Sequence, residues 1–131
     1  IPSRLGDERA KDTSQPWRTL FETGALITNG TDVPVERIDP IASYYSSVTR
    51  RMINGDEFYP EHIMTRKEAM ETYTINGAYS AFEEDIKGSL TPGKYADFVV
   101  LSENLLTVDY QEILSAEVEM TFVGGELKYQ K

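Results

Sequence analysis

The chain has 131 residues, no cysteine and one histidine, and its 13 basic and 22 acidic side chains give a formal net charge of −9. With 40% hydrophobic and 27% charged residues, it has the composition of a globular protein that can bury a core. The missing cysteine excludes disulfides, thiolate metal ligands and a cysteine nucleophile. The longest strongly apolar run, Phe98–Leu101, is far shorter than the roughly 20 residues that cross a bilayer, so we expect no membrane partner.

The acidity is concentrated in the second half of the chain. Residues 1–66 carry 8 basic and 10 acidic side chains, whereas residues 67–131 carry 5 and 12, a net charge of −7. This surface would repel phosphate backbones, so we expect no nucleic-acid partner. The charge is expected to keep the protein soluble, and whether it is cytoplasmic or exported is left open. Because the chain opens at Ile1 without an initiator methionine, we also expect an upstream segment or a removed leader.

Helix-start and helix-stop residues predict three helices. The first has Thr13 or Ser14 as its cap, enters through Pro16 and ends before Gly24. The second begins at Asp39-Pro40, an N-cap followed by proline at the first helical position.

The third helix opens with a capping box, Thr65-x-x-Glu68, and Asn76-Gly77 is expected to interrupt it. Between the first two helices, the apolar run Ala25–Thr28 predicts a fully buried strand. A helix, a buried strand and another helix are the repeating unit of an α/β protein with a parallel sheet.

The last third of the chain predicts strands. The segment Tyr95–Leu101 predicts a buried strand, and Val118, Met120 and Phe122 alternate with polar residues, which is the pattern of a half-buried strand. Gly124-Gly125 then forms a two-residue hairpin loop. Counting outward from that loop pairs Phe122 with position 127 and Met120 with position 129.

The candidate functional residue is Asp32, which directly follows the predicted buried strand. Functional groups of parallel α/β proteins gather at the carboxyl ends of strands. A carboxylate there could bind a divalent metal, act as a general base, or do both. From spacing alone, however, an Asx turn or a cap is the favoured role of Asp32, and the local sequence does not decide between the two. The single histidine, His62, reads as a loop residue with no second ligand near it in the sequence.

Several segments together resemble the amidohydrolase superfamily. Gly88–Leu101 (GSLTPGKYADFVVL) resembles its C-terminal signature, and Thr74–Ala78 (TINGA) resembles the preceding helix. Arg4–Arg9 (RLGDER) and Gly30–Val35 (GTDVPV) narrow the resemblance to the amidohydrolase 3 group, and Phe122–Leu127 (FVGGEL) resembles the closing hairpin.

The resemblance implies a fold of the α/β plus β class: the last strand and helices of a (β/α)₈ TIM-like barrel, followed by part of a small composite β-sandwich domain. It implies that residues 1–86 belong to the barrel and residues 87–131 to the β-sandwich. It also implies that Asp32 ends the eighth barrel strand, binds a catalytic metal, most often zinc, and shuttles a proton between water and the leaving nitrogen.

The function that the resemblance implies is hydrolysis of a non-peptide, amide-type carbon–nitrogen bond in a small molecule by metal-activated water. The family's histidine ligands and its midway lysine have no counterpart here, so they would lie upstream of Ile1. The 131-residue chain alone is therefore expected to be inactive and to hold no metal. Its strand edges could pair, so a homo-oligomer is possible. The competing hypothesis is a non-catalytic α/β module, derived from the same scaffold, that serves binding or assembly.

Overall fold

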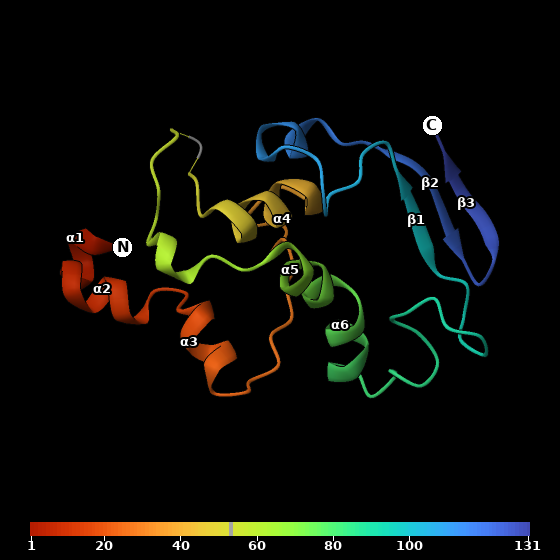
Figure 1. Cartoon of the computed structure of the whole chain (residues 1–131), viewed down its shortest axis with the longest axis horizontal. Coiled ribbons are helices and arrows are strands. Elements are labelled where there is room, and N and C mark those ends of the chain that lie inside the picture. The colour runs from red at the N-terminus through yellow and green to blue at the C-terminus, as the bar shows by residue number, and fades with distance from the viewer. Residues whose placement is uncertain (53) are drawn as a thin grey trace.

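The computed structural model describes residues 1–52 and 54–131. In Figure 1 the helices occupy one side and the centre of the molecule, and the strands form a sheet at the other side. None of the described helices is both long and apolar enough to span a membrane. The elements are α1 (Pro2–Leu5), α2 (Asp7–Thr13), α3 (Trp17–Glu22), α4 (Pro40–Thr49), η1 (Pro60–His62), α5 (Arg66–Tyr73), α6 (Ile75–Ser80), β1 (Phe98–Leu101), η2 (Tyr110–Ser115), β2 (Val118–Val123) and β3 (Glu126–Gln130).

Two of the predicted helix starts are confirmed in atomic detail. Asp39 caps α4, since its carboxylate accepts a hydrogen bond from the Ala42 backbone N–H at 3.0 Å. The capping box of α5 is complete: the Glu68 N–H donates to the Thr65 hydroxyl, and the Thr65 N–H donates to the Glu68 carboxylate. Each cap satisfies a backbone N–H that has no partner inside its helix.

The helix boundaries differ from prediction in two places. Neither Thr13 nor Ser14 caps α3; Pro16 occupies that position, and the Thr13 hydroxyl donates to the Arg9 carbonyl at the end of α2. Asn76-Gly77 does not interrupt a helix, because it lies inside α6, and the break comes at Thr74. The predicted interruption at Asn76-Gly77 therefore lies two residues after the observed break at Thr74.

The strand predicted at Ala25–Thr28 is not formed in this chain. The segment has no regular secondary structure and no strand pairing, and Leu26 is 45% exposed. A strand requires a neighbour that completes its backbone hydrogen bonds, and the strands of the described residues pair only with one another. Side chains and backbone groups of the helices bind this segment instead.

The sheet is antiparallel, with strand order β1-β2-β3. The hairpin register predicted at its tip is confirmed, with Phe122 opposite Leu127. Farther from the turn a bulge between Thr121 and Phe122 shifts the pairing, so Met120 faces Gln130 and not Tyr129. A bulge adds one residue to one strand, which a count along the sequence cannot anticipate.

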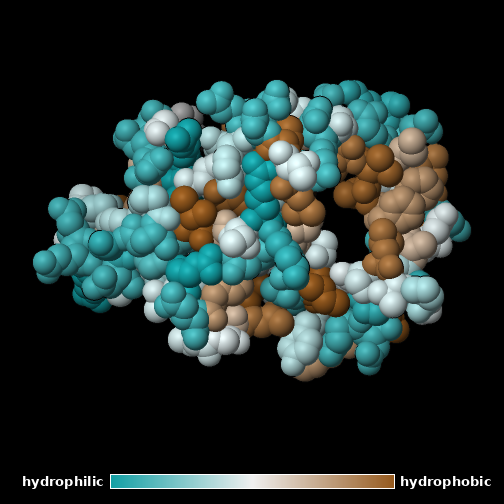
Figure 2. Space-filling view, in the orientation of Figure 1, coloured by the Kyte–Doolittle hydropathy of each residue, from teal (hydrophilic) through white to brown (hydrophobic). Residues whose placement is uncertain are grey.

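Apolar side chains gather on the sheet, beside an opening between it and the helical body (Figure 2). Within the sheet, the rings of Phe98 and Phe122 stack with centroids 4.5 Å apart. The main core lies elsewhere, around α4, and includes Tyr44, Val48 and Met64. Ile113 from η2 is fully buried in the same cluster, so the C-terminal part of the chain packs against α4.

Candidate active site

Asp32 lies on an exposed turn that follows the irregular segment 25–30. Its backbone is left-handed, with φ of 54°, a conformation that aspartate adopts more readily than most residues. Its carbonyl accepts hydrogen bonds from the N–H groups of Val35 and Glu36, at 2.8 and 3.4 Å. The side chain is exposed, and none of the ion pairs formed among the described residues includes its carboxylate. The turn thus uses the Asp32 backbone and leaves the side chain available to a ligand.

Three helices hold the segment that leads to this turn. The Asn29 side chain donates to the Ser47 hydroxyl of α4 at 2.9 Å, and the Asn29 N–H donates to the Thr72 carbonyl of α5 at 3.1 Å. From α6, the Asn76 side chain donates to the Ile27 carbonyl at 2.9 Å. These contacts position the residues before Asp32 without a neighbouring strand.

The donor set at Asp32 fits one ligand of a metal ion but not a complete site. An exposed carboxylate is a suitable oxygen ligand for a divalent metal. Within residues 1–52 and 54–131, however, no three histidine, aspartate or glutamate side chains gather to hold a metal. A zinc site in a protein takes three or four protein ligands. Asp32 would therefore need ligands from outside this set of residues.

His62 differs from its interpretation as a loop residue. It ends the 3₁₀ helix η1, is buried, and its Nε2 lies 3.2 Å from the Lys11 carbonyl. His62 therefore packs between η1 and α2 and has a structural role. No residue pattern near position 62 indicated the distant Lys11 contact.

Arg18 forms a clamp that sequence reasoning missed. Its guanidinium binds both carboxylate oxygens of Glu68, at 2.9 and 2.8 Å, and also the Ile63 carbonyl at 2.8 Å. The hydrogen bond from Arg18 lowers the pKa of the Glu68 carboxyl from 4.5 to about 2, and the same pair raises the pKa of Arg18. The capping box identified Glu68, but only the fold brings a residue 50 positions away onto it.

Arg50 is a second residue that sequence reasoning missed. It is 4% exposed, stacks between the Trp17 and Phe58 rings at 4.5 and 5.0 Å, and donates to the Phe58 carbonyl at 2.8 Å. Burial lowers the pKa of its guanidinium. It acts as a cross-link between α3, the end of α4 and the following loop, and its role is structural.

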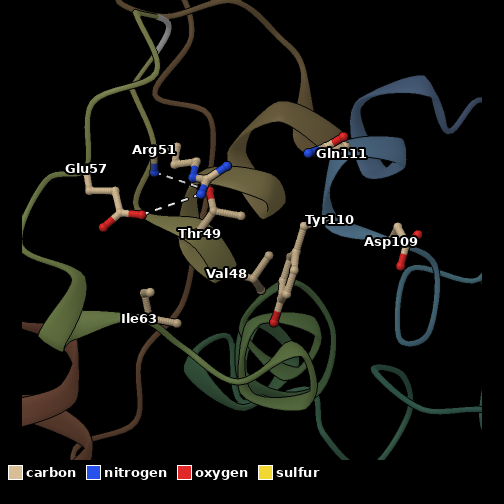
Figure 3. A pocket seen from close by; sticks show the side chains of 8 residues that line it. All are labelled: Val48, Thr49, Arg51, Glu57, Ile63, Asp109, Tyr110 and Gln111. Carbon is tan, nitrogen blue, oxygen red and sulfur yellow. Dashed lines mark hydrogen bonds and ion pairs between the residues drawn. The ribbon is translucent and has the colours of Figure 1, made fainter.

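A hollow of about 500 Å³ lies between the end of α4 and the start of η2 (Figure 3). Its charged side chains include Arg51 and Glu57, which form an ion pair at 3.5 Å, and Asp109. The Thr49 hydroxyl accepts from the Arg51 N–H and donates to a helix carbonyl. Arg51, Glu57 and the Thr49 hydroxyl thus already have partners of their own within or beside the hollow.

Comparison with known proteins identifies the class. The model of the amidohydrolase family matches residues 1–129. The chain is 32% identical over its whole length to YtcJ of Bacillus subtilis, whose name provisionally assigns it to the amidohydrolases. It is 36% identical over 98% of its length to protein LONG AFTER FAR-RED 3 of Arabidopsis thaliana, and 28% identical over 88% to N-substituted formamide deformylase of Arthrobacter pascens. The chain belongs to the amidohydrolase family.

The matched part of each relative is small. The chain spans 25%, 22% and 21% of the lengths of these three proteins. The chain also superposes on the crystal structure of an amidohydrolase from Thermotoga maritima, with a TM-score of 0.70 and 22% identity. The match covers 97% of this chain and 29% of the Thermotoga maritima chain. The fold of the chain is therefore that of one part of an amidohydrolase.

Proposed function

We propose that this chain is the C-terminal portion of a metal-dependent amidohydrolase that hydrolyses a non-peptide, amide-type carbon–nitrogen bond in a small molecule. Residues 1–86 would belong to its (β/α)₈ barrel and residues 87–131 to its composite β domain. One observation carries the proposal: Asp32 presents an unpaired, exposed carboxylate on a turn directly after a segment that three helices hold in place, in a chain of this family.

In this proposal Asp32 has two roles: it is one ligand of the metal, and it is the group that transfers the proton. A divalent metal, most often zinc in this chemistry, would lower the pKa of its bound water to about 7 and polarise the carbonyl. Asp32 accepts a proton from the water while the water oxygen forms a bond to the carbonyl carbon of the substrate. It then delivers that proton to the nitrogen as the carbon–nitrogen bond breaks. General acid–base catalysis of this kind contributes about 10²–10⁴-fold to the rate.

The test is Asp32→Asn in the full-length protein. N-substituted formamides are the first substrates to assay, since one relative is named as a deformylase of that class, and released formate is the readout. We expect kcat to fall by about 10²–10⁴-fold, with a lower zinc content by elemental analysis. Asparagine keeps the size of the side chain but is a poor base and a weak metal ligand.

The matched control is Glu36→Gln, which removes one negative charge from the same exposed turn. We expect it to keep turnover and zinc content near those of the wild type. Near-normal turnover by the Asp32→Asn variant would overturn the role of Asp32.

The alternative is a non-catalytic binding or assembly module built on the same scaffold. The lack of any three-ligand group among the described residues favours it. The two proposals differ in the full-length protein: a module would show neither stoichiometric zinc nor hydrolysis of any amide tested, whereas the enzyme would show both.

A further inference from the structure

Asn29 is the residue that connects the Asp32 turn to the helices. It is half-buried and lies three positions before Asp32. Its side-chain oxygen accepts from the Gly30 N–H at 2.9 Å, while its side-chain nitrogen donates to the Ser47 hydroxyl at 2.9 Å. Its backbone N–H donates to the Thr72 carbonyl. One residue thus makes a local bond and two bonds to other elements.

The two partners of Asn29 are rigid parts of the core. Ser47 and Thr72 are each 1% exposed. The Ser47 hydroxyl donates to the Ser43 carbonyl at 3.0 Å, and the Ser47 carbonyl accepts from the Met64 N–H at 3.0 Å. The Thr72 carbonyl lies in the last turn of α5, where carbonyls have no partner within the helix. Asn29 therefore binds groups that cannot easily shift.

The turn itself has only local support. Its hydrogen bonds run from Val35 and Glu36 back to the Asp32 carbonyl, and both donors are exposed. Such bonds preserve the shape of a turn but do not orient it relative to α4 or α5. Two flanking residues connect it to helices: Asp39 after the turn, as the N-cap of α4, and Asn29 before it, which is the last residue ahead of Asp32 that is bonded to a helix.

We propose that Asn29 is a positioning residue that, through its bond to Ser47, fixes where the Asp32 carboxylate points. The inference rests on the proposed role of Asp32. Groups that orient a metal ligand typically change metal affinity or activity by about 10–100-fold when they are removed. Asn29 itself would touch neither the metal nor the substrate.

The test is Asn29→Ala in the full-length protein, with zinc affinity measured by competition with a chelator and kcat measured separately from KM. We expect zinc affinity and kcat each to fall by about 10–100-fold, with KM little changed. Partial unfolding would lower the active fraction but would not change the zinc affinity of the molecules that remain folded.

Two further variants make the result specific. Ser47→Ala removes the acceptor for Asn29 and is expected to weaken zinc binding in the same direction; it also replaces the test if the Asn29→Ala variant does not fold. Asn104→Ala is the matched control, because Asn104 accepts from the Leu106 N–H as Asn29 does from Gly30, within its own loop. We expect it to leave zinc affinity unchanged.

The double variant Asn29→Ala/Asp32→Asn separates this inference from the proposed function. If Asn29 acts through Asp32, adding Asn29→Ala to Asp32→Asn produces no further loss. The positioning role is overturned if Asp32→Asn is impaired while Asn29→Ala keeps wild-type zinc affinity, or if the two losses add. If Asp32→Asn itself behaves as the wild type, the proposed function fails and the inference fails with it.

Discussion

Gly88 begins the segment that leads from the helices to the sheet, and two constraints restrict the position to glycine. Its φ is +87°, a conformation that side chains disfavour. A Cβ built on it would lie 2.6 Å from the Ala78 Cβ and 3.0 Å from the Ile75 Cα. Both neighbours belong to α6, and Ala78 is buried, so the loop can cross the helix only without a side chain.

We predict that Gly88→Ala lowers the free energy of unfolding by about 2–6 kcal/mol, as backbone strain and overpacking each cost about 1–3 kcal/mol. Gly93→Ala is the matched control, because Gly93 has φ of +98° but nothing within 4 Å of its added Cβ. Urea denaturation of the two variants measures the difference. Equal losses would show that the close approach to α6 contributes nothing.

At the scale of elements, Glu68 connects helix α5, which it caps, to helix α3. One of its carboxylate oxygens completes the capping box of α5 at Thr65, and both bind Arg18 of α3. The pair is only partly exposed, at 31% for the Arg18 side chain and 26% for the Glu68 side chain. Its bidentate geometry makes it stronger than an ordinary surface ion pair.

We predict that Glu68→Gln lowers stability at neutral pH by about 1–2 kcal/mol, since glutamine preserves the capping box but not the charge. Because the pKa of Glu68 is about 2 in the folded chain and 4.5 ordinarily, the stabilisation is fully present above about pH 4.5 and is lost as the pH falls toward 2. The difference between the two proteins should shrink over that range.

Thr65→Ala is the control for this comparison. It removes the cap but keeps the ion pair, so its loss of stability should change less between pH 6 and pH 3 than that of Glu68→Gln. Thermal denaturation at several pH values measures both. A Glu68→Gln effect that is independent of pH would contradict the assignment of the low pKa to the Arg18 pair.

At the scale of the molecule, the chain after β1 returns to the helices. The Leu105 carbonyl accepts from the Arg66 side chain at 2.9 Å and lies 3.2 Å from the Tyr44 hydroxyl. The Arg66 guanidinium also lies 4.2 Å from the centre of the Tyr110 ring. The division at residues 86 and 87 stays a prediction, but segment 105–116 contributes to the core around α4.

We predict that the 131-residue chain alone does not retain stoichiometric zinc, because the described residues bring no three ligands together and a zinc site needs at least that number. Dialysis against zinc and then against metal-free buffer, followed by elemental analysis, measures the bound metal. The Asp32→Asn chain is the control for adventitious binding. About one zinc per chain, absent from that control, would contradict the prediction.

Short-range patterns in the sequence predicted much of the local structure. The Asp39 cap, the Thr65 capping box and the Gly124-Gly125 hairpin were correct because all their interacting atoms lie within a few residues of one another. The predicted buried strand at 25–28 failed because strand formation depends on a partner distant in sequence. The register count failed beyond the bulge at 121–122 for a related reason, because the bulge depends on how β2 pairs with β3.

The candidate site likewise combines features that local sequence predicted with contacts that only the fold creates. A carboxylate after an apolar run indicated Asp32, and the amidohydrolase-like motifs indicated the family, which comparison confirmed. The bonds from Asn29 to Ser47 and Thr72, and the Arg18 clamp on Glu68, span 18 to 50 residues of chain. Such contacts leave no spacing pattern, because any distant polar residue could make them and the packing of α3, α4 and α5 selects which one does.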